Sequence, residues 1–129
     1  MSSKREALED KLAEALGYAE IPFVRQFYFA KHLRRKTTGR PYMYRADFLI
    51  RRHDGDPTGI IVEVQGGTWT GGRHTLGKGY DEDRFKAALA QRIGYVYIEV
   101  TASMIREGVA LTLIESALGR TELWQEAAA

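Results

Sequence analysis

Two carboxylates stand out because each lies inside an otherwise apolar, strand-like stretch of the chain. Asp47 belongs to residues 44–50 (YRADFLI), and Glu63 belongs to residues 59–65 (GIIVEVQ). The intervening residues 51–58 are polar and rich in turn formers, which predicts a β-hairpin. The two acids would then lie on neighbouring strands.

Side-chain alternation determines which residues accompany these acids. One face of each strand carries an acid: Arg45, Asp47 and Leu49 on the first strand, and Ile61, Glu63 and Gln65 on the second. If these faces coincide, two carboxylates share an apolar surface, where they repel each other and lose hydration. Proteins usually accept that cost for metal or proton chemistry, so we expect a site there.

Composition places this chemistry in an ordinary globular protein. The 129 residues are 44% hydrophobic and 28% charged, which predicts one domain over residues 1–129. The chain has no cysteine, which excludes disulfides and thiolate metal sites. It also shows no secretory leader and no apolar stretch near the ~20 residues that span a bilayer. We therefore expect a cytoplasmic protein without a membrane segment.

The elements that must position the acids follow from periodicity and end signals. We expect helices at 3–16, 80–93 and about 104–118, strands at 23–32, 44–50, 59–65 and 95–100, and a frayed tail at 119–129. The order α-β-β-β-α-β-α predicts a three-layer α/β/α sandwich. Three antiparallel strands followed by a crossover to a parallel fourth make its central sheet mixed.

Helix signals add two residues to the possible site. Ser3 and Glu6 form a capping box, Gly17 is expected to end the first helix, and Glu9 lies at the flank of its apolar stripe. The helix at 80–93 has a predicted core face, which Lys86 flanks; that face comprises Phe85, Ala88, Leu89 and Ile93. Further along, residues 101–103 are expected to cap the last helical region, with a break near Gly108.

Two segments carry groups suited to binding nucleic acid. The first is a basic block comprising Lys31, Arg34, Arg35, Lys36, Arg40, Arg45, Arg51 and Arg52. It is a plausible phosphate-binding surface. The second is a glycine-rich loop at 68–79 that contains Trp69, Arg73, His74 and Lys78. Polar and aromatic loops that directly follow a strand often serve a site.

The arrangement of Asp47 and Glu63-x-Gln65 between helices resembles the PD-(D/E)XK nuclease superfamily. Within it, the chain is most similar to small phage and prophage endonucleases related to very-short-patch repair enzymes. The resemblance extends over nearly the whole chain and is carried by residues 7–10 (ALED), 24–26 (VRQ), 46–48 (ADF), 62–69 (VEVQGGTW), 72–75 (GRHT), 83–86 (DRFK) and 94–95 (GY). The usual lysine two residues after the glutamate is Gln65 here.

The resemblance implies metal-assisted phosphodiester hydrolysis. Asp47 and Glu63 would hold Mg²⁺ or Mn²⁺ together with the Val64 carbonyl and waters. The other implied roles are Lys86 as the cation that replaces the missing lysine, Gln65 as a group that orients the nucleophile, Glu9 as an acid reaching the metal shell through water, and Arg73 and His74 as DNA contacts or proton carriers.

Each of these residues also has a structural explanation. Asp47 could be a hairpin-edge charge, Glu9 part of a solvated helix face, and Lys86 an ion-pair partner of nearby helix acids. Trp69 could anchor its loop on the core, and the basic block could simply keep the protein soluble.

Three functions therefore remain open, of which we favour the first. The chain is a metal-dependent DNA endonuclease for branched or replication-intermediate phage DNA, a weakly active or inactive DNA-binding module, or a structural subunit. Its expected partner is double-stranded or branched DNA. A homodimer through the strand at 23–32 is also open.

Overall fold

The computed structural model describes residues 3–65 and 78–121. The elements are α1 (Lys4–Tyr18), β1 (Val24–Tyr28), β2 (Arg45–Ile50), β3 (Ile60–Val64), α3 (Lys78–Ile93), β4 (Val96–Val100), α4 (Ala102–Arg106) and α5 (Val109–Ala117). This is the predicted order, with the last helix divided in two at Gly108, whose φ is +80°. Of the loop predicted at 68–79, residues 68–77 lie outside the described residues, as does most of the tail. Lys78 and Gly79 do not belong to a loop but begin α3, two residues before the predicted helix start.

The four strands form one mixed sheet in the order β1-β2-β3-β4. β1 pairs antiparallel with β2, β2 pairs antiparallel with β3, and β3 pairs parallel with β4. The mixed sheet and the hairpin predicted around residues 51–58 are thus confirmed. β1 is an edge strand, and the homodimer through this strand stays a prediction.

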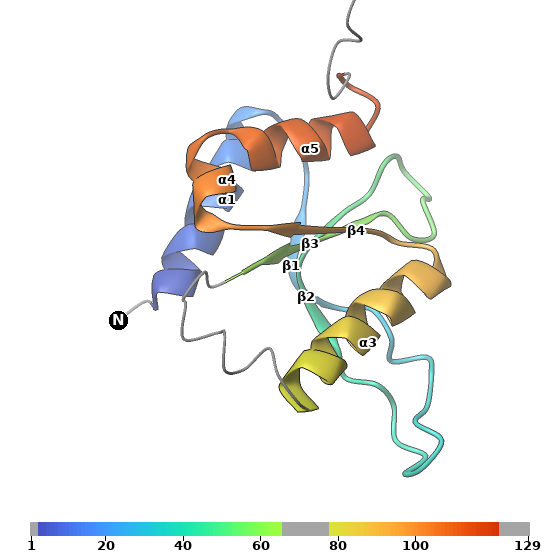
Figure 1. Cartoon of the computed structure of the whole chain (residues 1–129). Helices are drawn as coiled ribbons and strands as arrows, with labels where there is room; N and C mark the ends of the chain where they lie inside the picture. Colours follow the sequence, from blue (N-terminus) through green and yellow to red (C-terminus); the bar gives the residue numbers. More distant parts are fainter. Residues whose placement is uncertain (1–2, 66–77, 122–129) are drawn as a thin grey trace, which may run out of the picture.

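Helices cover both faces of the sheet, which confirms the three-layer sandwich (Figure 1). On one face, α1, α4 and α5 pack over a core that includes Leu12, Leu16, Phe48, Val62 and Ile114. On the other face, α3 packs over a smaller core that includes Phe29, Leu49, Ile61 and Ala90. Leu49 and Ile61 share this second face, as the alternation along the two strands predicts.

Several predicted boundaries and faces were wrong. α1 continues through Gly17 to Tyr18, because Gly17 lacks the positive φ of a left-handed stop. β1 is shorter than the predicted strand at 23–32. In α3, Ala88 and Phe85 are exposed and Ala87 and Ala90 are buried instead. A narrow core face of alanines lets this helix lie close to the sheet.

Helix caps agree with the sequence. Ser3 precedes α1, and its hydroxyl accepts a hydrogen bond from the Glu6 N–H at 3.1 Å. Thr101 caps α4 by accepting from the Met104 N–H at 3.3 Å. These bonds satisfy backbone donors that have no partner within the helix. Among the described residues, no helix is long and apolar enough to cross a membrane.

Gly59 and Gly17 offer a matched test of this fold. A Cβ on Gly59 would lie 2.6 Å from the Ile50 carbonyl oxygen, and its φ is +118°. A Cβ on Gly17 would meet nothing within 4 Å. We expect Gly59→Ala to lower the free energy of unfolding by about 3 kcal/mol through strain and overpacking. Gly17→Ala should raise it by up to about 1 kcal/mol, because alanine favours a helix. Urea unfolding measures both, and equal effects would contradict the hairpin geometry.

Candidate active site

The two predicted acids are buried and adjacent at the end of the β2–β3 pair. Asp47 and Glu63 are 5% and 3% exposed. The Asp47 N–H donates to Glu63 Oε2 at 3.3 Å, and the Val64 N–H donates to Asp47 Oδ2 at 2.8 Å. Each carboxylate therefore accepts a bond from the backbone of the other strand. This exchange holds the two acids together where regular strand pairing stops.

Lys86 reaches these acids from α3. Its ammonium forms an ion pair with Glu63 Oε1 and donates to the Arg45 carbonyl at 2.8 Å. The prediction that Lys86 flanks the core face of its helix is confirmed, and its side chain is only 19% exposed. The structural explanation, a pair with nearby helix acids, is not the arrangement found. Lys86 instead forms its ion pair with Glu63, a buried acid on β3.

Arg5, which the sequence analysis did not select, reaches the acids from the opposite layer. Its guanidinium donates to Asp47 Oδ1 at 3.1 Å and to Oδ2 at 3.0 Å, and it lies 3.6 Å from Glu9. Both hydrogen bonds come from one nitrogen, Nη2, and both are charge-assisted. The signal available in the sequence was the spacing of Arg5 and Glu9, because residues four apart on a helix are neighbours.

Glu9 lies in the same cleft and is 5% exposed. Its Oε1 accepts from Gln26 at 2.9 Å and from Arg25 at 3.5 Å, both on β1. Gln26 has a φ of +57°, which is uncommon outside glycine and interrupts its pairing opposite Asp47. Backbone strain of this kind costs about 1–3 kcal/mol and is concentrated at functional sites. The solvated-face explanation for Glu9 is therefore wrong.

The site forms an open cleft of about 660 Å³. Its lining is almost entirely charged or polar and comprises Ser3, Arg5, Glu6, Glu9, Asp10, Arg25, Gln26, Arg45, Asp47 and Lys86. Helix α1, strands β1 and β2, and helix α3 all contribute to it. Such a cleft suits a polar, charged ligand better than an apolar one.

Burial changes how readily the acids ionise. It raises the pKa of Glu63 to about 7, the charge of Asp47 adds to that rise, and the Lys86 ammonium opposes it. Burial also raises the pKa of Glu9, as does the Asp47 charge, against the lowering effects of Arg5 and Arg25. Glu9 lines the cleft, whereas Glu63 is buried behind it against Asp47. Perturbed acids grouped in this way are typical of functional sites. Glu63 is poised to change its charge near neutral pH.

The oxygen atoms of these acids differ in what they contact. Both oxygens of Asp47 accept hydrogen bonds. Glu63 Oε1 contacts the Lys86 ammonium but accepts no hydrogen bond of regular geometry from the described residues. Within residues 3–65 and 78–121, no three acidic or histidine side chains are close enough to hold a metal together. Two carboxylates completed by a backbone carbonyl and waters are the arrangement that Mg²⁺ commonly uses.

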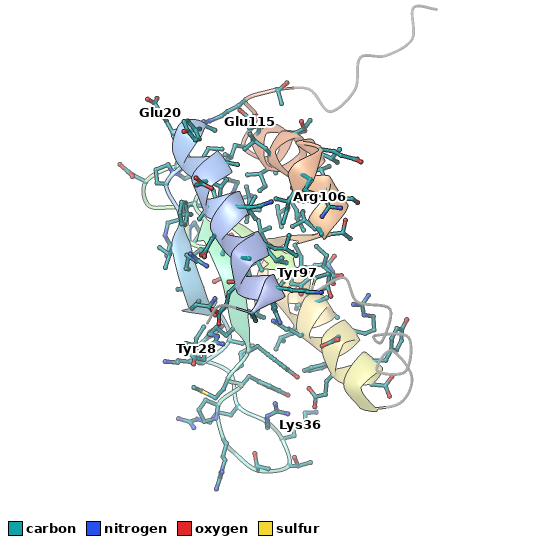
Figure 2. The ribbon with its side chains drawn as sticks, turned by 90° about the vertical axis from the view of Figure 1, so that its left-hand side faces the viewer. Glu20, Tyr28, Lys36, Tyr97, Arg106 and Glu115 are labelled. Carbon is teal, nitrogen blue, oxygen red and sulfur yellow. The ribbon has the colours of Figure 1, made fainter. Side chains whose placement is uncertain are left out.

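The remaining predicted residues are distributed unevenly. Gln65 follows β3 with its side chain exposed, and its N–H donates to Val100 at 2.8 Å. Arg45 lines the cleft. Arg35, Lys36 and Arg40 lie on the loop between β1 and β2, where Figure 2 shows Lys36 well beyond Tyr28 at the end of β1. Trp69, Arg73, His74 and the side chain of Lys78 lie outside the described part of the chain.

No protein-family model matches the sequence, and comparisons with curated proteins and with solved structures gave no significant match.

Proposed function

We propose that the chain is a metal-dependent DNA endonuclease that hydrolyses phosphodiester bonds. The observation that supports this most is the meeting of three groups from different elements. Asp47 of β2 and Glu63 of β3 are buried side by side, and Lys86 of α3 forms an ion pair with Glu63. Burying two acids costs free energy that an ordinary hairpin has no reason to accept. The resemblance to PD-(D/E)XK nucleases implies metal-binding roles for Asp47 and Glu63, and Lys86 is our candidate for the cation that replaces the missing lysine.

The donor atoms fit a hard cation. Carboxylate and carbonyl oxygens are the ligands that Mg²⁺ and Mn²⁺ prefer. Glu63 Oε1 contacts the Lys86 ammonium, so a metal at this atom would have to share it with that cation or displace it. Asp47 and Glu63 would hold the metal, with the Val64 carbonyl as a third protein ligand. When bound, such a metal polarises a phosphate and lowers the pKa of a coordinated water.

The other residues of the site would compensate charge, position water and contact DNA. Lys86 of α3 would offset the negative charge that develops on the phosphate, in place of the lysine that the superfamily usually has at the position of Gln65. Glu9, held by Gln26 and Arg25, would act on waters of the metal shell. Gln65 would orient the attacking water. Arg45 in the cleft and the basic loop at 33–41 would contact DNA phosphates.

Arg5 is expected to compete with the metal, because its guanidinium neutralises Asp47 in this structure. Arg5→Ala should therefore tighten Mn²⁺ binding several-fold, since the cation no longer has to displace a charge-assisted pair. Titration calorimetry with Mn²⁺ measures this, with Lys4→Ala as a control that removes a neighbouring charge. Weaker Mn²⁺ binding in Arg5→Ala alone would show that Arg5 orders the acids instead of competing for them.

The proposed activity is tested with the native chain on supercoiled plasmid and on branched DNA. We expect nicking with Mg²⁺ or Mn²⁺ and none with EDTA. The branched substrates address the proposal that phage replication intermediates are the natural target. Sedimentation with and without DNA addresses the proposed dimer through the edge strand β1.

A second candidate is a DNA-binding module on the same fold with little or no catalysis. It is favoured by the exposed Gln65 at the usual lysine position and by the cations, Arg5 and Lys86, that already neutralise the acids. Salt-dependent DNA binding without metal-dependent nicking would support this module over the nuclease.

A further inference from the structure

A second cavity, of about 310 Å³, lies beside the acidic cleft and has a different lining. It is formed by Arg35 and Tyr42 from the loop before β2, by Tyr44 next to that strand, and by Asp81, Glu82 and Phe85 of α3. Figure 1 shows this loop projecting past the sheet toward α3. The cavity is therefore built by two segments that are distant in the sequence.

Aromatic rings dominate this cavity. Tyr42 and Tyr44 are nearly parallel, with centroids 5.7 Å apart and an interplanar angle of 13°. Phe85 is tilted against both rings, at 5.7 Å from Tyr42 and 6.2 Å from Tyr44. The Phe85 side chain is 46% exposed, although other positions on the same helix are buried. Exposing a large apolar ring in a group of rings is a feature of binding surfaces.

Arg35 completes the platform. Its guanidinium lies 4.7 Å from the Tyr42 ring centroid and 5.6 Å from that of Tyr44. The backbone around it is held by hydrogen bonds from Arg35 N to Arg40 O at 2.8 Å and from Gly39 N to Arg35 O at 2.9 Å. A planar cation over aromatic rings is a common platform for nucleobases.

Tyr44 is fixed by a hydrogen bond from its hydroxyl to Glu82 at 2.5 Å. Burial and this bond raise the pKa of Tyr44 to about 12. The ring also stacks on Phe29 from the other side, at 6.3 Å and 16°. The platform is thus pre-ordered, which lowers the entropy cost of binding.

The two cavities are neighbours along both elements that form them. Tyr44 lines the aromatic cavity and Arg45 lines the acidic cleft; on α3, Phe85 lines the former and Lys86 the latter. A hydrogen bond from the Lys86 ammonium to the Arg45 carbonyl links α3 to β2 at this point. The linings of the two cavities are therefore one residue apart along the chain at both places.

We propose that the cavity between Arg35, Tyr42 and Phe85 binds an unpaired nucleobase of a DNA strand whose phosphate lies in the acidic cleft. This inference rests on the proposed function and narrows its substrate to DNA with an unpaired segment. Asp81 and Glu82, which also line the cavity, disfavour a phosphate in the cavity itself. They suit the exocyclic amino groups of a base, which donate hydrogen bonds to carboxylates.

Binding measured in EDTA tests this without reference to cleavage. Fluorescence anisotropy would follow a labelled single-stranded oligonucleotide, a duplex of the same sequence, and an abasic oligonucleotide that keeps the phosphates. We expect Phe85→Ala to weaken binding of the single strand about tenfold or more and to leave the abasic oligonucleotide unchanged. Phe85→Tyr should restore binding, whereas Phe85→Leu should not, because leucine has no ring to stack. Tyr18→Ala, which removes an aromatic side chain that is 89% exposed, is the matched control.

The outcomes separate this inference from the proposed activity. Equal losses on base-bearing and abasic strands, full binding by Phe85→Leu, or no single-strand binding by the native chain would each overturn the base site. Loss confined to base-bearing strands supports it even if the native chain cleaves nothing, and in that case only the nuclease proposal fails. Thermal unfolding confirms that each variant is folded.

Discussion

Replacing Glu63 by glutamine is expected to abolish metal-dependent cleavage while making the metal-free protein more stable at neutral pH. Glutamine has nearly the same shape but cannot supply a charged ligand to the cation. Because a metal contributes several kcal/mol to such a reaction, cleavage should fall by at least about a thousandfold. Plasmid nicking under matched conditions measures this. Asp47→Asn should behave alike, and Glu14→Gln, at an exposed position of α1, should have no effect.

The stability gain follows from the pKa of Glu63, which burial raises to about 7. Between about pH 4.3, the ordinary glutamate value, and pH 7, folded Glu63 keeps a proton that the unfolded chain has released. The stability contribution of this group therefore falls as the pH rises through that window. Glu63→Gln removes this loss of stability. The excess in free energy of unfolding of the variant over the native chain, measured with urea in EDTA, should therefore be largest above pH 7 and vanish toward pH 4.

Either half of this prediction can fail separately. Full cleavage by Glu63→Gln would remove the basis of the nuclease proposal. Lost cleavage with an unchanged pH profile would keep the site and contradict the account of its buried charge. Lost cleavage together with the expected pH-dependent gain in stability would identify Glu63 as a residue retained for chemistry at the expense of stability.

Replacing Lys86 by methionine is expected to lower cleavage by about 10²–10³-fold, the usual loss when one preorganised electrostatic group is removed. Methionine keeps the apolar stem but removes the ammonium that contacts Glu63 and the Arg45 carbonyl. Without that cation the pKa of Glu63 rises further, so the cleavage optimum should move to higher pH. Lys86→Arg should retain part of the activity, because it preserves the charge.

Gln65 provides the comparison for Lys86. Its side chain is exposed at the end of β3, so Gln65→Ala should reduce cleavage far less than Lys86→Met does. Gln65→Lys would place a second cation at the position usual for the superfamily. A large loss in Gln65→Ala together with a small loss in Lys86→Met would show that Lys86 is only an ion-pair partner. The pH profiles separate these cases, since an ion pair that only supports the fold would not move the optimum.

Much of this site was predictable from local sequence. Apolar stretches around Asp47 and Glu63, with a turn-rich segment between them, required the hairpin and brought the acids to neighbouring strands. Ser3 and Thr101 marked helix starts through the oxygen that each offers to the backbone. Lys86 was predictable as a flank residue because helical periodicity places it beside the core face.

The tertiary structure alone decided how the charges are compensated. Arg5 and Lys86 are far apart in sequence. Only the packing of α1 and α3 on opposite faces of the sheet brings Arg5 to Asp47 and Lys86 to the neighbouring Glu63. The positive φ of Gln26 and the burial of Glu9 likewise depend on how β1 meets α1. Phe85 shows the same limit. Helical periodicity predicted that it is a core residue, but its side chain is exposed. The loop from β1 supplies Tyr42 as an alternative contact and leaves Phe85 exposed. Periodicity records which way a side chain points along its own element, whereas the partner it meets depends on the packing of distant segments.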